Sequence, residues 1–406
     1  MNQTKLATPG GVDSGRAWLV VAGTFLSAAV TLGTVYSFGS FFESMAADFG
    51  TGKGQTAVVF GVTTFSFFWL SLITGRLADR FGPRPVMLAG AASLFGGLMI
   101  TSTVNSITVG YITYGAGAGF AGACGYIPMV ATVGGWFDRH RAAAVGISTA
   151  GIGVGTLVMN PLATRLLESY SWRTTFRIIG VAGTLILVVC ALLVARIPGS
   201  TNQSESRFGE ALRSAVFRRL WLAALFSGMA LFVPFVFIVP YAKQNGVTPS
   251  TAAWLVGLLG GSSVISRIGF GALTKRYGAF RLFRFGLLLY PVGYVVWLAS
   301  GSSYLMLMLF VIVFGTGYGS FVAVSPLVLA DRFGVIGLGS LMGLLYTTQG
   351  LGGLLGPPIA GQLIDSTDSY RTPMVVALAF SLTSVGLLYT IKVNSNGSLD
   401  PEPAPG

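Results

Sequence analysis

One arginine stands far inside an otherwise uncharged apolar stretch of the sequence. Arg267 lies in the segment 250–274, eight residues before Lys275, so a helix would place it roughly 12 Å from that charged end. Burying a guanidinium in hydrocarbon costs about 2.5 to more than 10 kcal/mol, and such a residue usually faces a cavity and finds a partner. Because its planar donors match a carboxylate in a bidentate pair, Arg267 is a candidate anchor for an anionic ligand.

The sequence offers no acid at the depth of Arg267 to neutralise it. All 13 Asp and Glu residues fall near segment ends, in loops or in the tails, so the missing counter-ion is the ligand itself. One positive charge favours a ligand with one negative charge, because a second carboxylate would stay uncompensated in a low-dielectric site. The alternative is that Arg267 pairs with helix carbonyls and lines a water-filled cavity that is only structural.

Polar and aromatic residues within other apolar segments are candidates for the rest of the site. Hydroxyls and amides can bind a hydroxy or keto group, and aromatic rings can form apolar walls. Each is equally a candidate for a hydrogen bond between helices, which is the commoner role of an intramembrane polar side chain. The candidates are Tyr36, Tyr114, Tyr126, Asn160, Phe235, Ser263, Tyr318, Tyr346 and Gln349.

The composition shows which elements must hold these residues in place. The chain has 406 residues, of which 53% are hydrophobic and 9% charged, whereas about a quarter of the residues of a soluble protein are charged. A membrane-crossing helix needs about 20 apolar residues, so the chain accommodates a dozen and no separate globular domain. The sequence predicts an all-α membrane protein with spans at 17–42, 55–77, 85–104, 107–135, 141–167, 173–195, 219–243, 250–274, 281–299, 303–330, 337–364 and 372–392.

An internal repeat divides the spans into two bundles of six. Asp138-Arg139 after the fourth span recurs as Asp331-Arg332 after the tenth. Parallel repeats of this kind place a substrate site near the bilayer midplane between the halves. The predicted domains are a tail at 1–16, a bundle at 17–195, a linker at 196–218, a bundle at 219–393 and a tail at 394–406.

Basic residues predict the orientation in the membrane. Eighteen of the 25 Lys and Arg residues flank the spans on the side of both termini, and only six lie on the opposite side. Since such residues accumulate on the cytoplasmic side, both termini are predicted to be cytoplasmic in a plasma (cytoplasmic) membrane. This asymmetry, with affinity for anionic lipid, accounts for the net charge of +12. No nucleic-acid partner is expected.

Several motifs carry a resemblance to a known family. Gly75-Arg-Leu-Ala-Asp-Arg-Phe-Gly-Pro-Arg84, with a degenerate copy at Gly271–Arg281, resembles the signature loop of the major facilitator superfamily. Trp136–Gly151 and Phe232–Lys243 are similar to the fifth-helix signature and the seventh helix of its monocarboxylate transporter group. Arg267 stands where that group binds the substrate carboxylate. The resemblance is to a bacterial homologue of this group.

The sequence departs from that group at three positions. Tyr36 stands where animal members have a lysine for proton and substrate handling, and Ser263 where they have an aspartate. Gln349 matches the position of a second substrate-binding lysine in the related oxalate exchangers. Recognition of a monoanion is compatible with these changes, but the family's usual proton relay is not evident.

The resemblance implies a secondary active transporter. Such a protein would move a small monocarboxylate such as lactate or pyruvate by alternating access, with a proton, and we expect a monomer. Alternatives are an organic-anion exchanger or facilitator, and a non-transporting membrane sensor of such anions. A cytoplasmic charge network would stabilise the outward-open state and break during rocking. Its residues are Asp79, Arg80, Arg84, Asp138, Arg139, Arg141 and Asp331.

Enzymatic activity, cofactors and metals are not expected. His140 is the one histidine, in a predicted loop, and Cys124 and Cys190 both fall in apolar runs, so no catalytic triad or metal-ligand set can be assembled. The glycines at 115, 117 and 119 superficially resemble a dinucleotide-binding loop, but that motif needs a strand before it and a βαβ context. They fit close helix packing instead.

Overall fold

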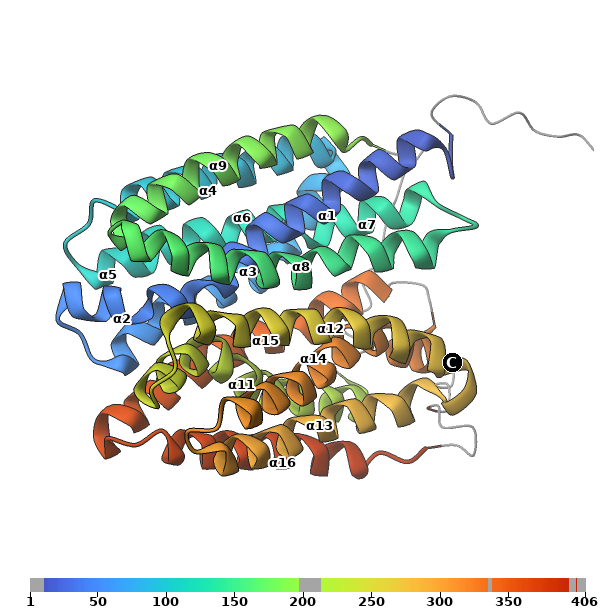
Figure 1. The fold of residues 1–406 in the computed structure, drawn as a ribbon. Coiled ribbons are helices and arrows are strands. Elements are labelled where there is room, and N and C mark those ends of the chain that lie inside the picture. Colours follow the sequence, from blue (N-terminus) through green and yellow to red (C-terminus); the bar gives the residue numbers. More distant parts are fainter. Residues whose placement is uncertain (1–10, 197–212, 335–337, 394–398, 400–406) are drawn as a thin grey trace, which may run out of the picture.

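The computed structural model describes residues 11–196, 213–334, 338–393 and Leu399, which form helices and turns with no strand among them. The predicted linker and both predicted tails lie largely outside these residues, so the domain boundaries remain a prediction. Figure 1 shows two layers of long helices, the blue-to-green first half above the yellow-to-red second half. We call the helices α1–α9 the N-terminal bundle and α11–α16 the C-terminal bundle.

The N-terminal bundle follows the predicted spans with two interruptions. Its helices are α1 (Gly15–Tyr36), α2 (Phe38–Phe49), α3 (Lys53–Phe81), α4 (Pro83–Thr101), α5 (Ile107–Gly110), the π-helix η1 (Tyr111–Ala116), α6 (Gly117–Gly125), α7 (Ile127–Trp136), α8 (Arg141–Ser169) and α9 (Trp172–Leu193).

The C-terminal bundle has six long helices. They are α11 (Ala215–Gln244), α12 (Pro249–Tyr277), α13 (Ala279–Ser300), α14 (Tyr304–Phe333), α15 (Leu338–Thr367) and α16 (Arg371–Tyr389). In the described chain eleven helical stretches are long and apolar enough to cross a membrane, with α1 and α2 counted as one stretch and α5 to α7 as another. The helix that does not meet this test is α15, which has two adjacent prolines inside it.

Two predicted spans are broken where the sequence analysis expected continuous helices. The span predicted at 17–42 is interrupted at Ser37, whose hydroxyl donates to the carbonyl of Thr34, and it then continues to Phe49 as α2. The span predicted at 107–135 contains η1 and a break at Tyr126, just before Pro128. Hydroxyls that bond their own backbone and prolines in the next turn both interrupt helices. Tyr36 and Tyr126 therefore lie at helix breaks.

The two bundles meet along three helix pairs. These pairs are α3 with α15, α8 with α12, and α2 with α11. At the close approach of α8 to α12, a Cβ added to Gly153 would lie 2.5 Å from the carbonyl oxygen of Gly260. Glycine is therefore required there, because a side chain would hold the helices apart.

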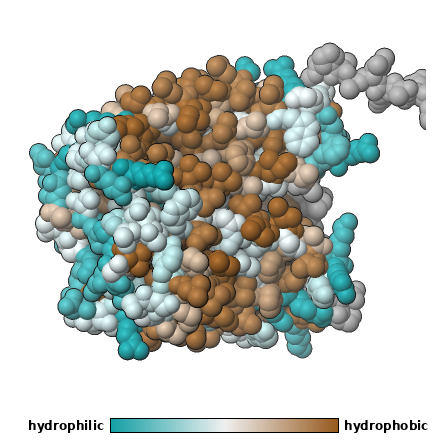
Figure 2. All heavy atoms as spheres, viewed as in Figure 1, coloured by the Kyte–Doolittle hydropathy of each residue, from teal (hydrophilic) through white to brown (hydrophobic). Residues whose placement is uncertain are grey.

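The bundles are in contact at one end of the molecule and apart at the other. We call the end carrying residues 50–52 and 368–370 the far face, and the end carrying residues 11–14 and 390–393 the termini face. Near the far face a Cβ on Gly361 would lie 2.6 Å from the carbonyl oxygen of Lys53. Toward the termini face, Gly146 and Gly271 have open space at the Cβ position. Figure 2 shows the surface hollowed between the bundles on the right, on the side of the termini.

An aspartate before α1 holds the loop before α8. The Asp13 carboxylate accepts hydrogen bonds from the backbone amides of Arg139 at 3.1 Å and His140 at 3.4 Å, and it lies 3.4 Å from Nδ1 of His140. The Arg139 amide is the leading cause of a lowered pKa of the Asp13 carboxyl. The two elements are far apart in sequence, so this contact fixes the start of α1 against α8.

We expect acid to release this contact. Because the folded-state pKa is lowered, the stabilisation is complete above the ordinary carboxyl pKa and is lost only as the pH falls through the lower folded value. At neutral pH, Asp13→Asn should make hydrogen exchange several-fold faster at the amides of Arg139 and His140. Asp138→Asn is the control, since the Asp138 carboxylate forms its ion pair with Arg141 on its own side of the loop, and the substitution leaves the backbone amide that donates to Asp13 in place. Equal exchange in Asp13→Asn and the wild type would contradict the capping role.

Candidate functional site

Arg267 lies between the two bundles with most of its donors unused. Its side chain projects from α12 and the residue is only 8% exposed. Nη1 donates to the carbonyl oxygen of Thr149 on α8 at 2.5 Å, whereas Nε and Nη2 are buried without a hydrogen-bond partner. In the described part of the chain no carboxylate forms an ion pair with it. The site is a desolvated cation with two free donors.

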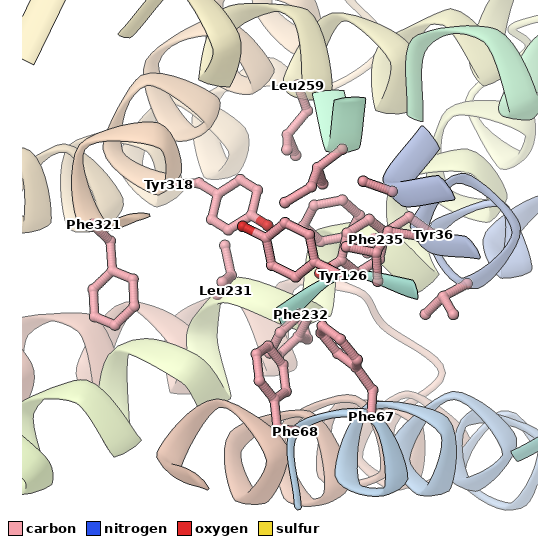
Figure 3. Close-up of a cluster of buried hydrophobic side chains, with 14 of the residues drawn as sticks. Tyr36, Phe67, Phe68, Tyr126, Leu231, Phe232, Phe235, Leu259, Tyr318 and Phe321 are labelled. Carbon is pink, nitrogen blue, oxygen red and sulfur yellow. The ribbon is translucent and has the colours of Figure 1, made fainter. Parts of the chain in front are cut away.

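Tyrosines from both bundles surround this guanidinium. The ring of Tyr318 on α14 lies 5.6 Å from the guanidinium carbon, within cation–π range. Tyr36, Tyr126 and Tyr346 each interact electrostatically with Arg267. Figure 3 shows the hydroxyls of Tyr126 and Tyr318 pointing toward one another, with Tyr36 and Phe235 beside them. Five of the predicted residues therefore meet at Arg267 or beside it, and they come from five different predicted spans of the two halves.

Phenylalanines close the site on one side. Phe235 on α11 packs against Tyr36 at 4.6 Å and edge-on against Tyr318 at 6.0 Å between ring centroids. Phe232 and Phe68 extend this wall, and Phe68 also faces Tyr346 at 6.1 Å. The sequence did not single out Phe232 or Phe68 as lining residues. Phe232 lies one helical turn before Phe235 in the same motif, a spacing that could have found it, whereas nothing distinguishes Phe68 among the 29 phenylalanines.

Three predicted lining residues are used within their own bundle instead. The Tyr114 hydroxyl donates to the carbonyl of Thr34 at 3.2 Å, and its ring stacks on Phe176. Gln349 donates through Nε2 to the carbonyl of Ala224 at 3.0 Å. Both side chains form hydrogen bonds between neighbouring helices, which is the commoner role of an intramembrane polar side chain. The Ser263 hydroxyl bonds the carbonyl of Gly260 on its own helix.

Asn160 is partly available. Its Nδ2 donates to the carbonyl of Thr156 on α8 at 3.0 Å, and its Oδ1 is buried without a hydrogen-bond partner. A buried acceptor without a hydrogen-bond donor lowers the stability of the folded protein. Asn160 lies on the helix that also carries Thr149, but no contact joins it to Arg267 in this conformation.

The predicted gating residues lie on the termini face. Arg84 donates to the carbonyl of Val194 at 2.7 Å, and Asp79 interacts with Arg196, whose Nη2 donates to the Asp79 carbonyl at 2.9 Å. The remaining five residues of the set do not form ion pairs across the bundles within the described chain. Arg80 lies over the ring of Phe81, Arg139 donates its amide to Asp13, Asp138 pairs with Arg141, and Asp331 lies in the last turn of α14. This agrees with the separation of the bundles there.

The chain matches a known family along most of its length. A family model described as Major Facilitator Superfamily matches residues 24–278 and again residues 220–405. The chain belongs to the major facilitator superfamily. Among curated relatives, monocarboxylate transporter 4 of Rattus norvegicus is 30% identical over 388 residues, covering 92% of this chain and 82% of the relative. Monocarboxylate transporter 13 of Bos taurus is 28% identical over 401 residues, covering 93% and 90%.

Solved structures share the fold of this superfamily member. A mutant of the nucleoside transporter NupG superposes with a TM-score of 0.74 at 14% identity, covering 93% of this chain and 99% of that one. A bacterial homologue of the human lysosomal transporter Spinster, inward-facing and unoccupied, gives 0.73 at 16% identity, covering 93% and 97%. The predicted resemblance and fold class are confirmed. This superfamily member is a multi-pass membrane transporter related to monocarboxylate transporters, not an enzyme.

Proposed function

We propose that this transporter carries a small monocarboxylate of the lactate or pyruvate type across the plasma membrane by alternating access, with Arg267 as the carboxylate anchor. The observation that carries the proposal is the buried guanidinium whose Nε and Nη2 have no partner. These two donors suit the two oxygens of one carboxylate. The names of the relatives point to the same class of substrate.

The lining of the site favours a ligand with one negative charge. One guanidinium can compensate one carboxylate, and a dianion would leave its second charge among Phe232, Phe235 and Tyr318 in a low-dielectric environment. The hydroxyls of Tyr126 and Tyr318, which face one another (Figure 3), are the groups we assign to a hydroxy or keto group on the ligand.

The contact of Arg267 with Thr149 supports alternating access around this site. The arginine belongs to the C-terminal bundle and the carbonyl to the N-terminal bundle, so the candidate anchor already joins the two moving parts. With both termini cytoplasmic, as we propose, the described conformation is open to the cytoplasm. The charged residues of the termini face would then form their network in the outward-open state.

We further propose that a proton accompanies the substrate, as the family resemblance implies. No carboxylate of the described chain lies beside Arg267 to carry it, so the proton would bind elsewhere or enter on the substrate. Because of that observation, electroneutral exchange or facilitated diffusion of an organic anion is the second candidate.

Uptake of labelled lactate into proteoliposomes tests these statements. We expect the protein to be a monomer and to drive accumulation of lactate in the liposomes when the outside is acidic. Unlabelled pyruvate should inhibit uptake of labelled lactate more strongly than an unlabelled dicarboxylate does. Lactate uptake that has the same rate with and without the pH gradient, but requires an anion inside the liposomes, would favour the exchanger. If neither lactate nor pyruvate moves under any gradient or exchange condition, the proposed substrate class is wrong.

A further inference from the structure

Two carboxylates on the far face reach across the boundary between the bundles. Glu43 on α2 forms an ion pair with Lys243 on α11. Asp365 on α15 accepts hydrogen bonds from the backbone amides of Lys53 and Gly54, both at 2.9 Å, at the start of α3. Each interaction joins the N-terminal bundle to the C-terminal bundle. Neither takes part in the candidate site around Arg267.

The Asp365 contact is a helix cap supplied by the other bundle. The first turn of α3 has unpaired amides and the positive end of the helix dipole, and its own N-cap, Gly52, has no side chain to satisfy them. A Cβ at Gly52 would lie 2.6 Å from Oδ2 of Asp365. The start of α3 is therefore shaped to receive a carboxylate from α15.

An aromatic ring lies beside both carboxylates. Tyr370, between α15 and α16, interacts electrostatically with Glu43 and Asp365, and Nζ of Lys53 lies 5.6 Å from the centre of its ring. Tyr370 also packs on Tyr241 of α11 with ring centroids 5.5 Å apart. The charged groups of the two contacts thus form one connected cluster.

We propose that Glu43, Lys243, Asp365 and the first turn of α3 form a latch that holds the far face closed. Movement of one bundle against the other must break both contacts, since each has one partner in each bundle. The ion pair is exposed, with side-chain exposures of 34% for Lys243 and 46% for Glu43, and such pairs are individually weak. Weak contacts suit a latch that must open in every transport cycle. This inference rests on the alternating access proposed above, but not on the identity of the substrate.

A cysteine in the seam between α3 and α15 reports opening of the far face. Ala57 is wholly buried and shares a helix face with Gly54 and Gly61, which both pack on α15. In an Ala57→Cys protein without substrate, the rate of alkylation by a membrane-impermeant maleimide follows the fraction of molecules with an open far face. Cys190, buried in the N-terminal bundle, reports unfolding in the same sample by peptide mass spectrometry.

Loss of either carboxylate should open the far face more often. We expect Asp365→Asn and Glu43→Gln each to accelerate alkylation at Ala57→Cys about five-fold, with alkylation at Cys190 unchanged. Asp368→Asn, which removes a neighbouring exposed carboxylate of the same face, should leave both rates at the wild-type value. The latch is refuted if neither variant raises the alkylation rate at Ala57→Cys, or if Asp368→Asn raises that rate as much as they do. It is also refuted if the alkylation rate at Cys190 rises together with the rate at Ala57→Cys. Lactate uptake measured separately tests the substrate, so either proposal can fail alone.

Discussion

Arg267→Ala is expected to lower kcat/KM for lactate uptake by about 100-fold or more. Removing one partner of a buried charge-assisted pair costs roughly 2–5 kcal/mol, and each 1.4 kcal/mol is a factor of ten. The loss should be this large because no second cation of the described chain is placed beside the tyrosines around Arg267. Initial rates of labelled lactate uptake in proteoliposomes, over a range of concentrations, measure the effect.

Two matched variants distinguish anchoring from general damage. Arg267→Lys keeps the charge but loses the planar pair of donors, so its activity should lie between those of the wild type and Arg267→Ala. Arg284→Ala removes another partly buried arginine, whose donors bond the carbonyls of Leu388 and Ile391 within the C-terminal bundle. It should lower thermal stability without raising the KM for lactate. Uptake by Arg267→Ala at the wild-type rate would end the proposal that this residue holds the carboxylate.

Gly153→Ala should lower transport about ten-fold by holding α8 away from α12. The new Cβ would lie 2.3 Å from Cγ2 of Val264 and 2.5 Å from the carbonyl oxygen of Gly260. Backbone atoms cannot yield as a flexible side chain can, and overpacking of this kind costs roughly 1–3 kcal/mol. The described conformation is destabilised relative to one with α8 and α12 further apart, and the contact of Arg267 with Thr149 is lost with it.

The control for this variant is a glycine of a peripheral helix. Gly386 on α16 has open space at its Cβ position, so Gly386→Ala should be neutral or slightly stabilising through better helix propensity. Uptake rates and thermal unfolding of both proteins, measured side by side in detergent and liposomes, separate the two effects. Equal uptake by Gly153→Ala and Gly386→Ala would show that the close approach of α8 to α12 is not needed for transport.

The candidate site contains one residue that the sequence singles out and several that only the folded chain brings together. The sequence singles out Arg267 because a cation inside an apolar segment is conspicuous without any knowledge of packing. The tyrosines gave no such signal: Tyr114 and Tyr318 stand in similar apolar and glycine-rich surroundings in the sequence. In the structure Tyr114 bonds Thr34 inside its own bundle, whereas Tyr318 lies over the guanidinium.

Local composition alone determined the membrane-spanning segments and the burial of Arg267. These properties depend on the transfer of side chains and backbone from water into lipid, which each segment undergoes largely by itself. Only the tertiary structure decided which polar side chains meet. That choice depends on the rotation of each helix about its axis, on the breaks at Ser37 and Tyr126, and on close approaches such as that at Gly153, and these are set by packing between segments far apart in the chain.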